Sequence, residues 1–160
     1  MIDFRPLSLR DAPRAAALIR AAFSAQGAVT TPPSSALKES VEIVERKLLE
    51  GGGAGAFAGD ELIGLILWAP DGDALYLGRL AIEPECRGKG LGARLMALGE
   101  SEALRRGFVK TRLRVRLELP LNRKFFARLG YAQVSAGAHP GHDHPTFAIL
   151  EKRVERAARM

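Results

Sequence analysis

The chain has 160 residues, 47% hydrophobic and 26% charged, which is the size and composition of one globular domain rather than two. It has no run of 18 or more apolar residues and no opening typical of a signal peptide, so we expect a cytoplasmic protein outside the membrane; one cysteine, Cys86, excludes an intramolecular disulfide. The net charge of +6 suits an anionic partner, but an aromatic content of 6% and the lack of a zinc or helix-turn-helix pattern give no support to nucleic acid.

The first third of the chain predicts one strand and two helices. Residues 2–7 alternate apolar and polar, which indicates a strand, and Pro6 places it at a sheet edge or ends it. Ser8 and Asp11 resemble a capping box that starts a helix with an apolar face. A polar, proline-broken loop over 24–35 then leads to a second helix over 36–50.

The next segments predict a hairpin. Gly51, Gly52 and Gly53 end the second helix, and the apolar runs 54–58 and 62–69 flank a short turn-rich connection. A second turn at 68–73 leads into another apolar run, 75–82, which is typical of a buried strand.

A glycine-rich turn follows that strand and precedes a helix that begins at Leu91. Gly88, Gly90 and Gly92 remove side chains where the backbone must come close to a bulky anion. The first N–H groups of the helix have no intrahelical acceptor and lie at the positive end of its dipole, and Arg87 and Lys89 add charge beside them. The turn therefore predicts a phosphate-binding site, the alternative being a flexible surface turn with solvated charges.

The last third predicts a basic strand, a short helix and two strands. Over 110–117 the apolar residues alternate with Lys110, Arg112, Arg114 and Arg116, whose face is either solvated or in contact with phosphates or an acidic acceptor. Residues 120–130 predict a helix that starts at a proline and ends at a glycine. Strands over 132–135 and 145–151 enclose a loop that holds all three histidines, His139, His142 and His144.

Two segments resemble the GCN5-related N-acetyltransferases (GNAT). Arg87-x-x-Gly90-x-Gly92, behind a strand that reads Leu80-Ala81-Ile82, is similar to the acetyl-CoA signature of that family. The segment 122–131, an asparagine followed by an aromatic pair and Leu-Gly-Tyr, is similar to its closing motif. The resemblance covers nearly the whole chain and implies an α/β domain over 1–153 with the GNAT acyl-CoA N-acyltransferase fold, a mixed, mostly antiparallel sheet flanked by helices. Residues 154–160 are then a charged tail, and a homodimer is compatible with the family.

The resemblance also implies an activity and a cofactor. The activity is N-acetylation, in which a primary amine of a small molecule or a protein N-terminus directly attacks the acetyl group of acetyl-CoA in a ternary complex. The turn would hold the pyrophosphate and the strand would lend its backbone to the pantetheine arm, while residues near 29–33 would touch the acceptor. The implied cofactor-binding residues are Leu80, Ala81, Ile82, Arg87, Gly88, Lys89, Gly90, Leu91, Gly92, Ala93, Asn122 and Phe126.

The catalytic groups of the family are not obvious in this chain. Phe126 stands where many members have a tyrosine that protonates the thiolate, and Gly78 stands near the position of their strand glutamate. An ammonium acceptor must lose a proton before its nitrogen attacks, and Glu83 and Glu85, at the end of the central strand, are the candidate bases. A backbone N–H near 80–82 could polarise the thioester carbonyl.

Other interpretations stay open at this point. The histidine loop is a candidate for acceptor contact or for a base, while a zinc site there lacks cysteine ligands and a rigid frame, so we predict no metal. The presence of Phe126 and Gly78 in place of the catalytic tyrosine and glutamate is also compatible with a catalytically silent acyl-CoA-binding or sensing module. Gly88-x-Gly90-x-x-Ala93 also fits a dinucleotide fingerprint. That fingerprint expects an acidic residue about twenty residues further on, at the end of the next strand, but the next strand here is rich in arginine and Glu118 comes late.

Overall fold

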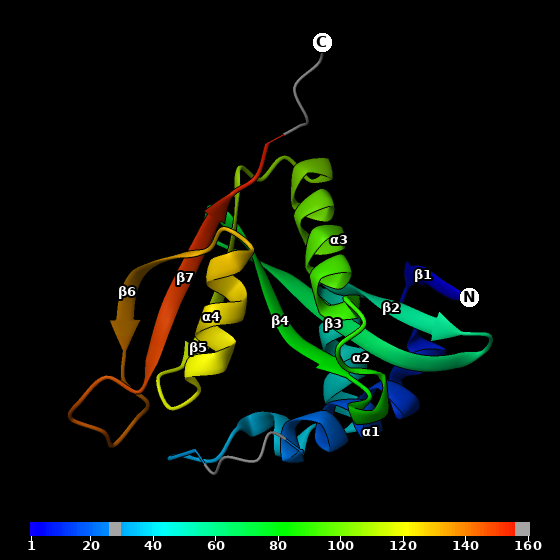
Figure 1. Ribbon diagram of the computed structural model, residues 1–160, viewed down its shortest axis with the longest axis horizontal. Coiled ribbons are helices and arrows are strands. Elements are labelled where there is room, and N and C mark those ends of the chain that lie inside the picture. The colour runs from blue at the N-terminus through cyan, green and yellow to red at the C-terminus, as the bar shows by residue number, and fades with distance from the viewer. Residues whose placement is uncertain (26–29, 156–160) are drawn as a thin grey trace.

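The computed structural model describes residues 1–25 and 30–155 and shows one mixed sheet with helices on both faces (Figure 1). The strands of the described part are β1 (Ile2–Pro6), β2 (Gly52–Ala58), β3 (Glu61–Asp71), β4 (Ala74–Ile82), β5 (Lys110–Arg116), β6 (Ala132–Gly137) and β7 (Phe147–Arg153). Its α-helices are α1 (Ala12–Ser24), α2 (Val41–Glu50), α3 (Leu91–Arg105) and α4 (Pro120–Arg128). Short 3₁₀ turns cover Leu9–Asp11, Ser35–Lys38 and Pro84–Cys86.

The strands follow the order β1-β2-β3-β4-β5-β7-β6, and every neighbouring pair is antiparallel except β4 and β5. This confirms the predicted mixed, mostly antiparallel sheet. The parallel pair is joined only at Leu75–Thr111 and Tyr76–Arg112, after which the two strands diverge. The sheet is therefore open in its middle, and Figure 1 shows β4 leaning away from β5.

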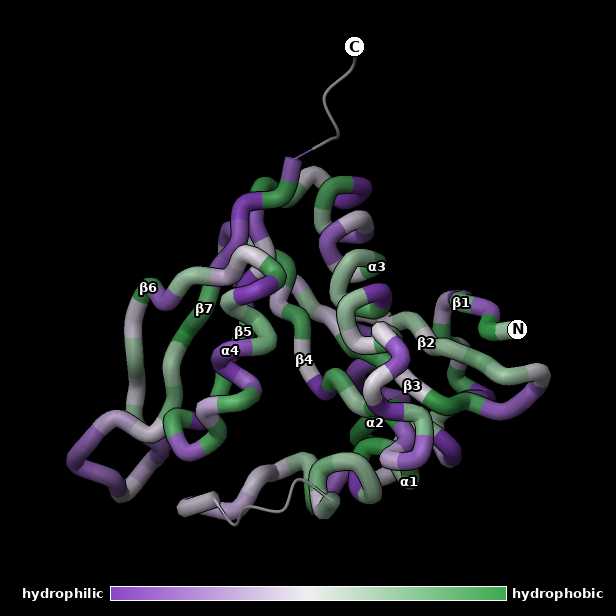
Figure 2. The backbone as a smooth tube through the Cα atoms, viewed as in Figure 1, coloured by the Kyte–Doolittle hydropathy of each residue, from purple (hydrophilic) through white to green (hydrophobic). Residues whose placement is uncertain are grey.

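Two apolar layers cover the two faces of the sheet. On one face, Leu75 and Leu77 of β4 pack with Leu95 of α3, in a cluster that also receives Phe126 of α4. On the other face, Leu65 and Leu67 of β3 pack with Leu18 and Ile19 of α1 and with Val44 of α2. Figure 2 shows these hydrophobic stretches meeting inside the molecule, while the loop between β6 and β7 is hydrophilic.

A bulge in β4 reverses which residues face each layer. Leu65 pairs with Ala81, but Leu67 pairs with Gly78, so β4 carries one residue more than β3 between these two pairs. Arg79 lies in this interval with a φ of +53°, a left-handed conformation that is uncommon outside glycine. As a result Leu80, rather than Arg79, continues the face begun by Leu75 and Leu77.

The second predicted helix is interrupted in the structure. Residues 36–50 form a 3₁₀ turn and then α2, which begins after Ser40, whose hydroxyl accepts a hydrogen bond from the Ile43 N–H. The serine competes with the helix for backbone partners and so ends one segment and caps the next. Glu39, between the two, is buried.

The ends of the chain agree with the local patterns. Pro6 both ends β1 and lies at the sheet edge. Val154 is buried in the main cluster, so packing continues just past 153, and residues 156–160 of the predicted tail lie outside the described residues. Among the residues that the structure describes, no helix is long and apolar enough to cross a membrane.

Candidate functional site

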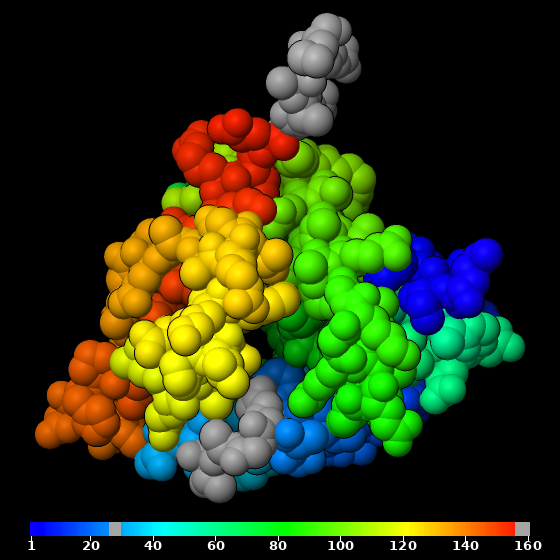
Figure 3. Space-filling model, in the orientation of Figure 1, coloured from blue at the N-terminus to red at the C-terminus, as the bar shows by residue number. Residues whose placement is uncertain are grey.

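A cavity of about 1120 Å³ lies where β4 and β5 diverge. Its lining comes from both faces of the sheet: the start of α3 and α4 on one face, and Phe23, Ser34 and Ser35 on the other. Figure 3 shows the corresponding hollow between α4 (yellow) and the start of α3 (green). The cavity therefore passes between the two arms of the sheet and has two chemically different halves.

The glycine turn forms one half. Gly88 and Gly90 adopt left-handed conformations, with φ of +80° and +79°, and Gly90 is the N-cap of α3. The Arg94 N–H donates to the Gly90 carbonyl, so the N–H groups before Arg94 in the first helical turn have no partner within the helix. A Cβ on Gly92 would lie 3.3 Å from Cζ of Phe125 in α4. The turn thus presents backbone donors, and a side chain at Gly92 would crowd Phe125, which fits a bound pyrophosphate.

The two cations of the turn are placed differently from each other. Arg87 donates to the Ala22 carbonyl over 2.9 Å and so ties the turn to the end of α1. Lys89 lines a second, smaller cavity instead of the large one. Every other predicted cofactor-binding residue, from Leu80 to Ala93 and at Asn122 and Phe126, lines the large cavity. Contact with the cofactor itself stays a prediction.

The aromatic residues of α4 form the side wall of this half. Phe126 packs edge to face on Phe125, with ring centroids 5.1 Å apart, and brings no hydroxyl to the cavity. The nearby phenol of Tyr131 is hydrogen-bonded to Thr111 Oγ1 at 2.7 Å and donates to Glu100 at 3.0 Å, on the buried side. Burial raises the pKa of Tyr131 well above its usual value. Tyr131 is therefore a structural residue, in agreement with its place before β6.

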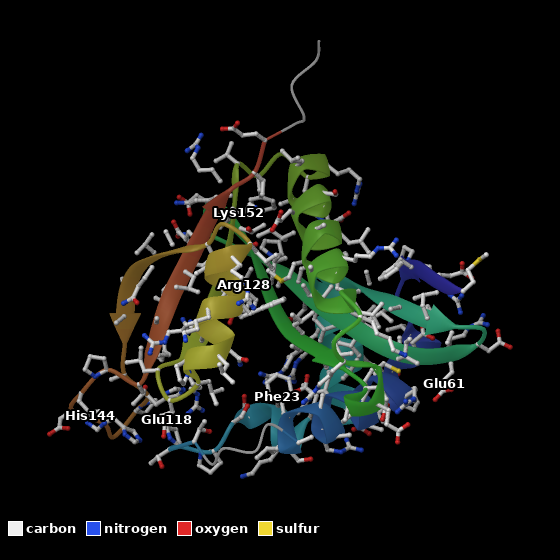
Figure 4. All side chains as sticks on the ribbon, in the orientation of Figure 1. Phe23, Glu61, Glu118, Arg128, His144 and Lys152 are labelled. Carbon is white, nitrogen blue, oxygen red and sulfur yellow. The ribbon has the colours of Figure 1, made fainter. Side chains whose placement is uncertain are left out.

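Glu83 and Glu85, the predicted bases, line the second cavity, of about 500 Å³, and neither lines the large one. Glu83 accepts a hydrogen bond from Arg14 at 2.8 Å, and the same guanidinium is 3.9 Å from Glu61, a residue of the β2–β3 hairpin labelled in Figure 4. A catalytic role for either glutamate stays a prediction, and the cavity that they line is a different one from the cavity between β4 and β5, although the two share Cys86 and Leu91 in their linings.

Tyr76 occupies the place where a strand glutamate would act. A Cβ on Gly78 would lie 2.9 Å from the Tyr76 ring, so this ring covers the glycine. The phenol lines the large cavity, and burial raises its pKa, which keeps it protonated at neutral pH. We did not predict this residue. One sequence signal of this arrangement is that the alternation of apolar residues shifts by one position after Arg79, which is typical of a β-bulge.

One histidine of the predicted loop reaches the cavity. His139 lines it, and the Nδ1 of its ring is within hydrogen-bonding distance of Thr146 Oγ1, whereas Nε2 has no hydrogen-bond partner among the described residues. Burial, followed by the charges of Arg116 and His142, lowers the pKa of His139, so its ring is neutral at neutral pH. His142 and His144 do not line the cavity, and Figure 4 shows His144 at the outer tip of the loop.

The loop between α1 and α2 closes this second half. Arg116 of β5 donates to the Pro32 carbonyl at 2.6 Å, and the Thr31 N–H donates to both oxygens of Glu118, at 3.1 and 3.2 Å. Thr30 lines the cavity, while Val29 lies outside the described residues, and contact of residues 29–33 with the acceptor stays a prediction. The loop is therefore fastened to the end of β5.

A buried carboxylate fastens the bulge of β4 to the same loop. The Glu39 side chain is 1% exposed and accepts from Lys47 at 2.8 Å and from Arg79 Nε at 3.3 Å. Arg79 also donates to Ser35 Oγ at 2.7 Å. No sequence pattern predicted this cluster, because Glu39 and Arg79 are 40 residues apart and neither belongs to a motif.

Comparisons with known proteins agree with this arrangement. A model of the acetyltransferase (GNAT) family matches residues 18–131. The structure is similar, at 22% identity and a TM-score of 0.80, to a PaiA N-acetyltransferase from Thermoplasma acidophilum in complex with coenzyme A, with 96% of this chain and 99% of that chain covered. It is also similar, at 17% identity and a TM-score of 0.75, to the ribosomal-protein-S18-alanine N-acetyltransferase of Escherichia coli, with 99% and 97% covered.

A third similar structure is the N-acetylglutamate synthase of Neisseria gonorrhoeae complexed with coenzyme A and N-acetyl-glutamate, at 23% identity and a TM-score of 0.75, with 98% of this chain and 36% of that chain covered. A search of curated proteins finds no match. At these identities the structures establish a shared fold, and the fold prediction is confirmed.

Proposed function

Because the chain belongs to the acetyltransferase (GNAT) family, we propose that it transfers the acetyl group of acetyl-CoA to a primary amine of a small molecule or a protein N-terminus. The observation that carries the proposal is the single cavity between β4 and β5, which has backbone donors for phosphate at one end and a neutral imidazole at the other. The acetyl group of acetyl-CoA and the acceptor amine can therefore meet in the gap between β4 and β5.

The described residues fit acetyl-CoA, which when bound would supply an acetyl group activated as a thioester. The turn 88–92 and the N–H groups of α3 would hold the pyrophosphate. Beyond Tyr76, β4 has no paired residue on β5, so the backbone of this edge is available to the amides of a pantetheine arm. Asn122, at the start of α4, would add a polar contact from the opposite wall.

We propose His139 as the general base. An amine that arrives as ammonium must lose a proton. In the proposed tautomer the proton of neutral His139 is on Nδ1, beside Thr146 Oγ1, and Nε2 can accept the proton of the ammonium. The depressed pKa keeps His139 in the basic form at neutral pH. Phe126 cannot return a proton to a departing thiolate, and Tyr76 is the phenol that lines the cavity in its protonated form.

Direct attack by the amine is the proposed route. Cys86, the one thiol of the chain, is half-buried and lines both cavities, and it packs against the cluster of Ala56, Ile63 and Leu91 as a small apolar residue does. The Cys86 thiol forms no hydrogen bond with a side chain among the described residues, so no base is positioned there to make it an acyl carrier.

The proposal is tested first by calorimetric titration with acetyl-CoA. We expect saturable binding that Gly92→Glu weakens at least about tenfold, because the new side chain enters the space beside Phe125 and puts a carboxylate next to the phosphate site. Ala97→Glu, on an exposed position of the same helix, is the matched control and should bind normally. Failure of the natural protein to bind acetyl-CoA would refute the proposal.

A second step separates an enzyme from a silent module. Release of free CoA thiol is followed with a panel of primary amines, and amine-dependent release is expected for at least one of them. Binding of acetyl-CoA without thiol release for any amine would favour the binding or sensing module instead.

A further inference from the structure

The four cations on one face of β5 differ in what they contact. Lys110 and Arg112 form ion pairs with Asp73 and Glu151, so the charges at the start of the strand are balanced. Arg116 donates a hydrogen bond to the Pro32 carbonyl. The side chain of Arg114 has no hydrogen bond or ion pair with any residue that the structure describes, whereas its backbone pairs with Ile149 of β7. It is also the one of the four whose side chain is exposed.

Arg114 is nevertheless held in a defined position. Its guanidinium carbon lies 4.8 Å from the centroid of the Phe147 ring, in a cation–π contact. His139 packs against the same ring, with centroids 5.2 Å apart. All three residues line the large cavity. A planar cation stacked on an aromatic ring keeps its N–H fork directed and loses little freedom when it binds an anion.

The face of the sheet places Arg114 away from the phosphate end. Thr111, Leu113 and Val115 point into the layer with α3 and α4, because they are buried there. The alternate residues of β5, Arg114 among them, lie on the opposite face, where the α1–α2 loop contacts Arg116. The pyrophosphate turn belongs to the α3 layer, so Arg114 serves the half of the cavity that the acceptor would enter.

We propose that the amine acceptor carries a carboxylate and that Arg114 binds this carboxylate while His139 faces the amine. The inference rests on the proposed function and names the substrate class of that site: a small molecule with both groups, of the amino-acid type. A carboxylate pairs with the guanidinium fork through two parallel hydrogen bonds. Since Arg114 and His139 pack on one ring, a single small molecule can reach both.

The charge around this half supports the same partner. The cations that line it are Lys47, Arg79, Arg114 and Arg116, and the acids that line it are Glu50 and Glu118. Glu39 forms ion pairs with both Lys47 and Arg79, and Glu118 lies 3.9 Å from Arg116. Arg114 is left as the charge without a counterion among the described residues, and an acceptor carboxylate would supply one.

The test compares amino acids with the amines formed by removing their carboxylates, such as phenylalanine with phenethylamine and methionine with 3-(methylthio)propylamine. Thiol release from acetyl-CoA gives kcat/KM for each member of a pair. We expect the best amino acid to exceed its decarboxylated partner at least about tenfold. Arg114→Gln should lower kcat/KM for that amino acid by about 10- to 100-fold, mainly through KM, and leave the amine within about twofold.

Arg153→Gln is the matched control: it removes the same charge at an exposed position on β7 outside the cavity, and it should leave kcat/KM unchanged for both members of the pair. A preference for the decarboxylated amines would overturn the inference, and so would an equal loss for both members of a pair in Arg114→Gln. Calorimetry decides the point without turnover: the CoA-saturated natural protein should bind an N-acetyl amino acid more tightly than the corresponding N-acetyl amine, and Arg114→Gln should remove the difference. Loss of acetyl-CoA binding would instead indicate failure of the proposed function.

Discussion

Substitution of Glu39 tests whether the buried carboxylate holds the bulge of β4 to the α1–α2 loop. Glu39→Ala leaves Lys47 and Arg79 without their shared acid. Breaking a buried ion pair by removing one partner costs about 3–5 kcal/mol. Here the cations keep side-chain exposures of 33% and 23%, so water replaces part of what is lost, and we expect a decrease of about 2–3 kcal/mol in the free energy of unfolding.

The two partners of Glu39 should respond unequally. Burial lowers the pKa of Lys47 despite its hydrogen bond to Glu39, which means that the folded environment disfavours the charged ammonium. Lys47→Met keeps the packing and removes that penalty, so its unfolding free energy should stay within about 0.5 kcal/mol of the natural value. Urea denaturation measures both variants, and Glu39→Ala should also lower Tm by about 5–10 °C.

Glu45→Ala is the control, because Glu45 lies on α2, the helix that carries Lys47, and forms no ion pair among the described residues. Its cost should stay below about 0.5 kcal/mol. The reasoning is wrong if Glu39→Ala costs no more than this control, or if Lys47→Met costs as much as Glu39→Ala.

Two further outcomes are expected. The acid limb of the pH profile of kcat/KM should have its midpoint below pH 6.5, because a base whose pKa is lowered stays neutral to lower pH. Arg114→Gln should move this midpoint upward, because it removes one of the charges that lower the pKa of His139. An acid limb that is absent from the natural enzyme, or that is unchanged in His139→Gln, would contradict the assignment of the base. Tyr131→Phe should lower the free energy of unfolding by about 1–2 kcal/mol by leaving the buried Thr111 hydroxyl without its partner. The raised pKa of Tyr131 means that its contribution is complete below pH 10 and is lost as pH rises above 10, so urea denaturation at pH 8 and pH 11 should show a smaller difference between the two proteins at pH 11.

The sequence by itself determined what depends on neighbours along the chain. The glycine turn, the strand before it, the helix after it and the short helix from Pro120 to Gly130 were predicted because turn chemistry and apolar periods of 2 and 3.6 residues are local properties. The family resemblance added the mixed, mostly antiparallel sheet flanked by helices, and the observed sheet confirmed it. Pro6 predicted an edge, since a residue without an N–H cannot serve a central strand.

Only the tertiary structure decided which polar groups meet. Three histidines share one loop, but His139 alone among them lines the cavity. Arginines that look alike along β5 separate into paired residues and Arg114, because their partners come from segments 39 to 84 residues away. Tyr76 lines the cavity and Glu39 pairs with Arg79 at the bulge of β4, and no sequence motif indicates either arrangement. Local patterns predict where a residue sits on a strand or helix, whereas its charge partner and its cavity depend on contacts between distant segments that such patterns do not contain.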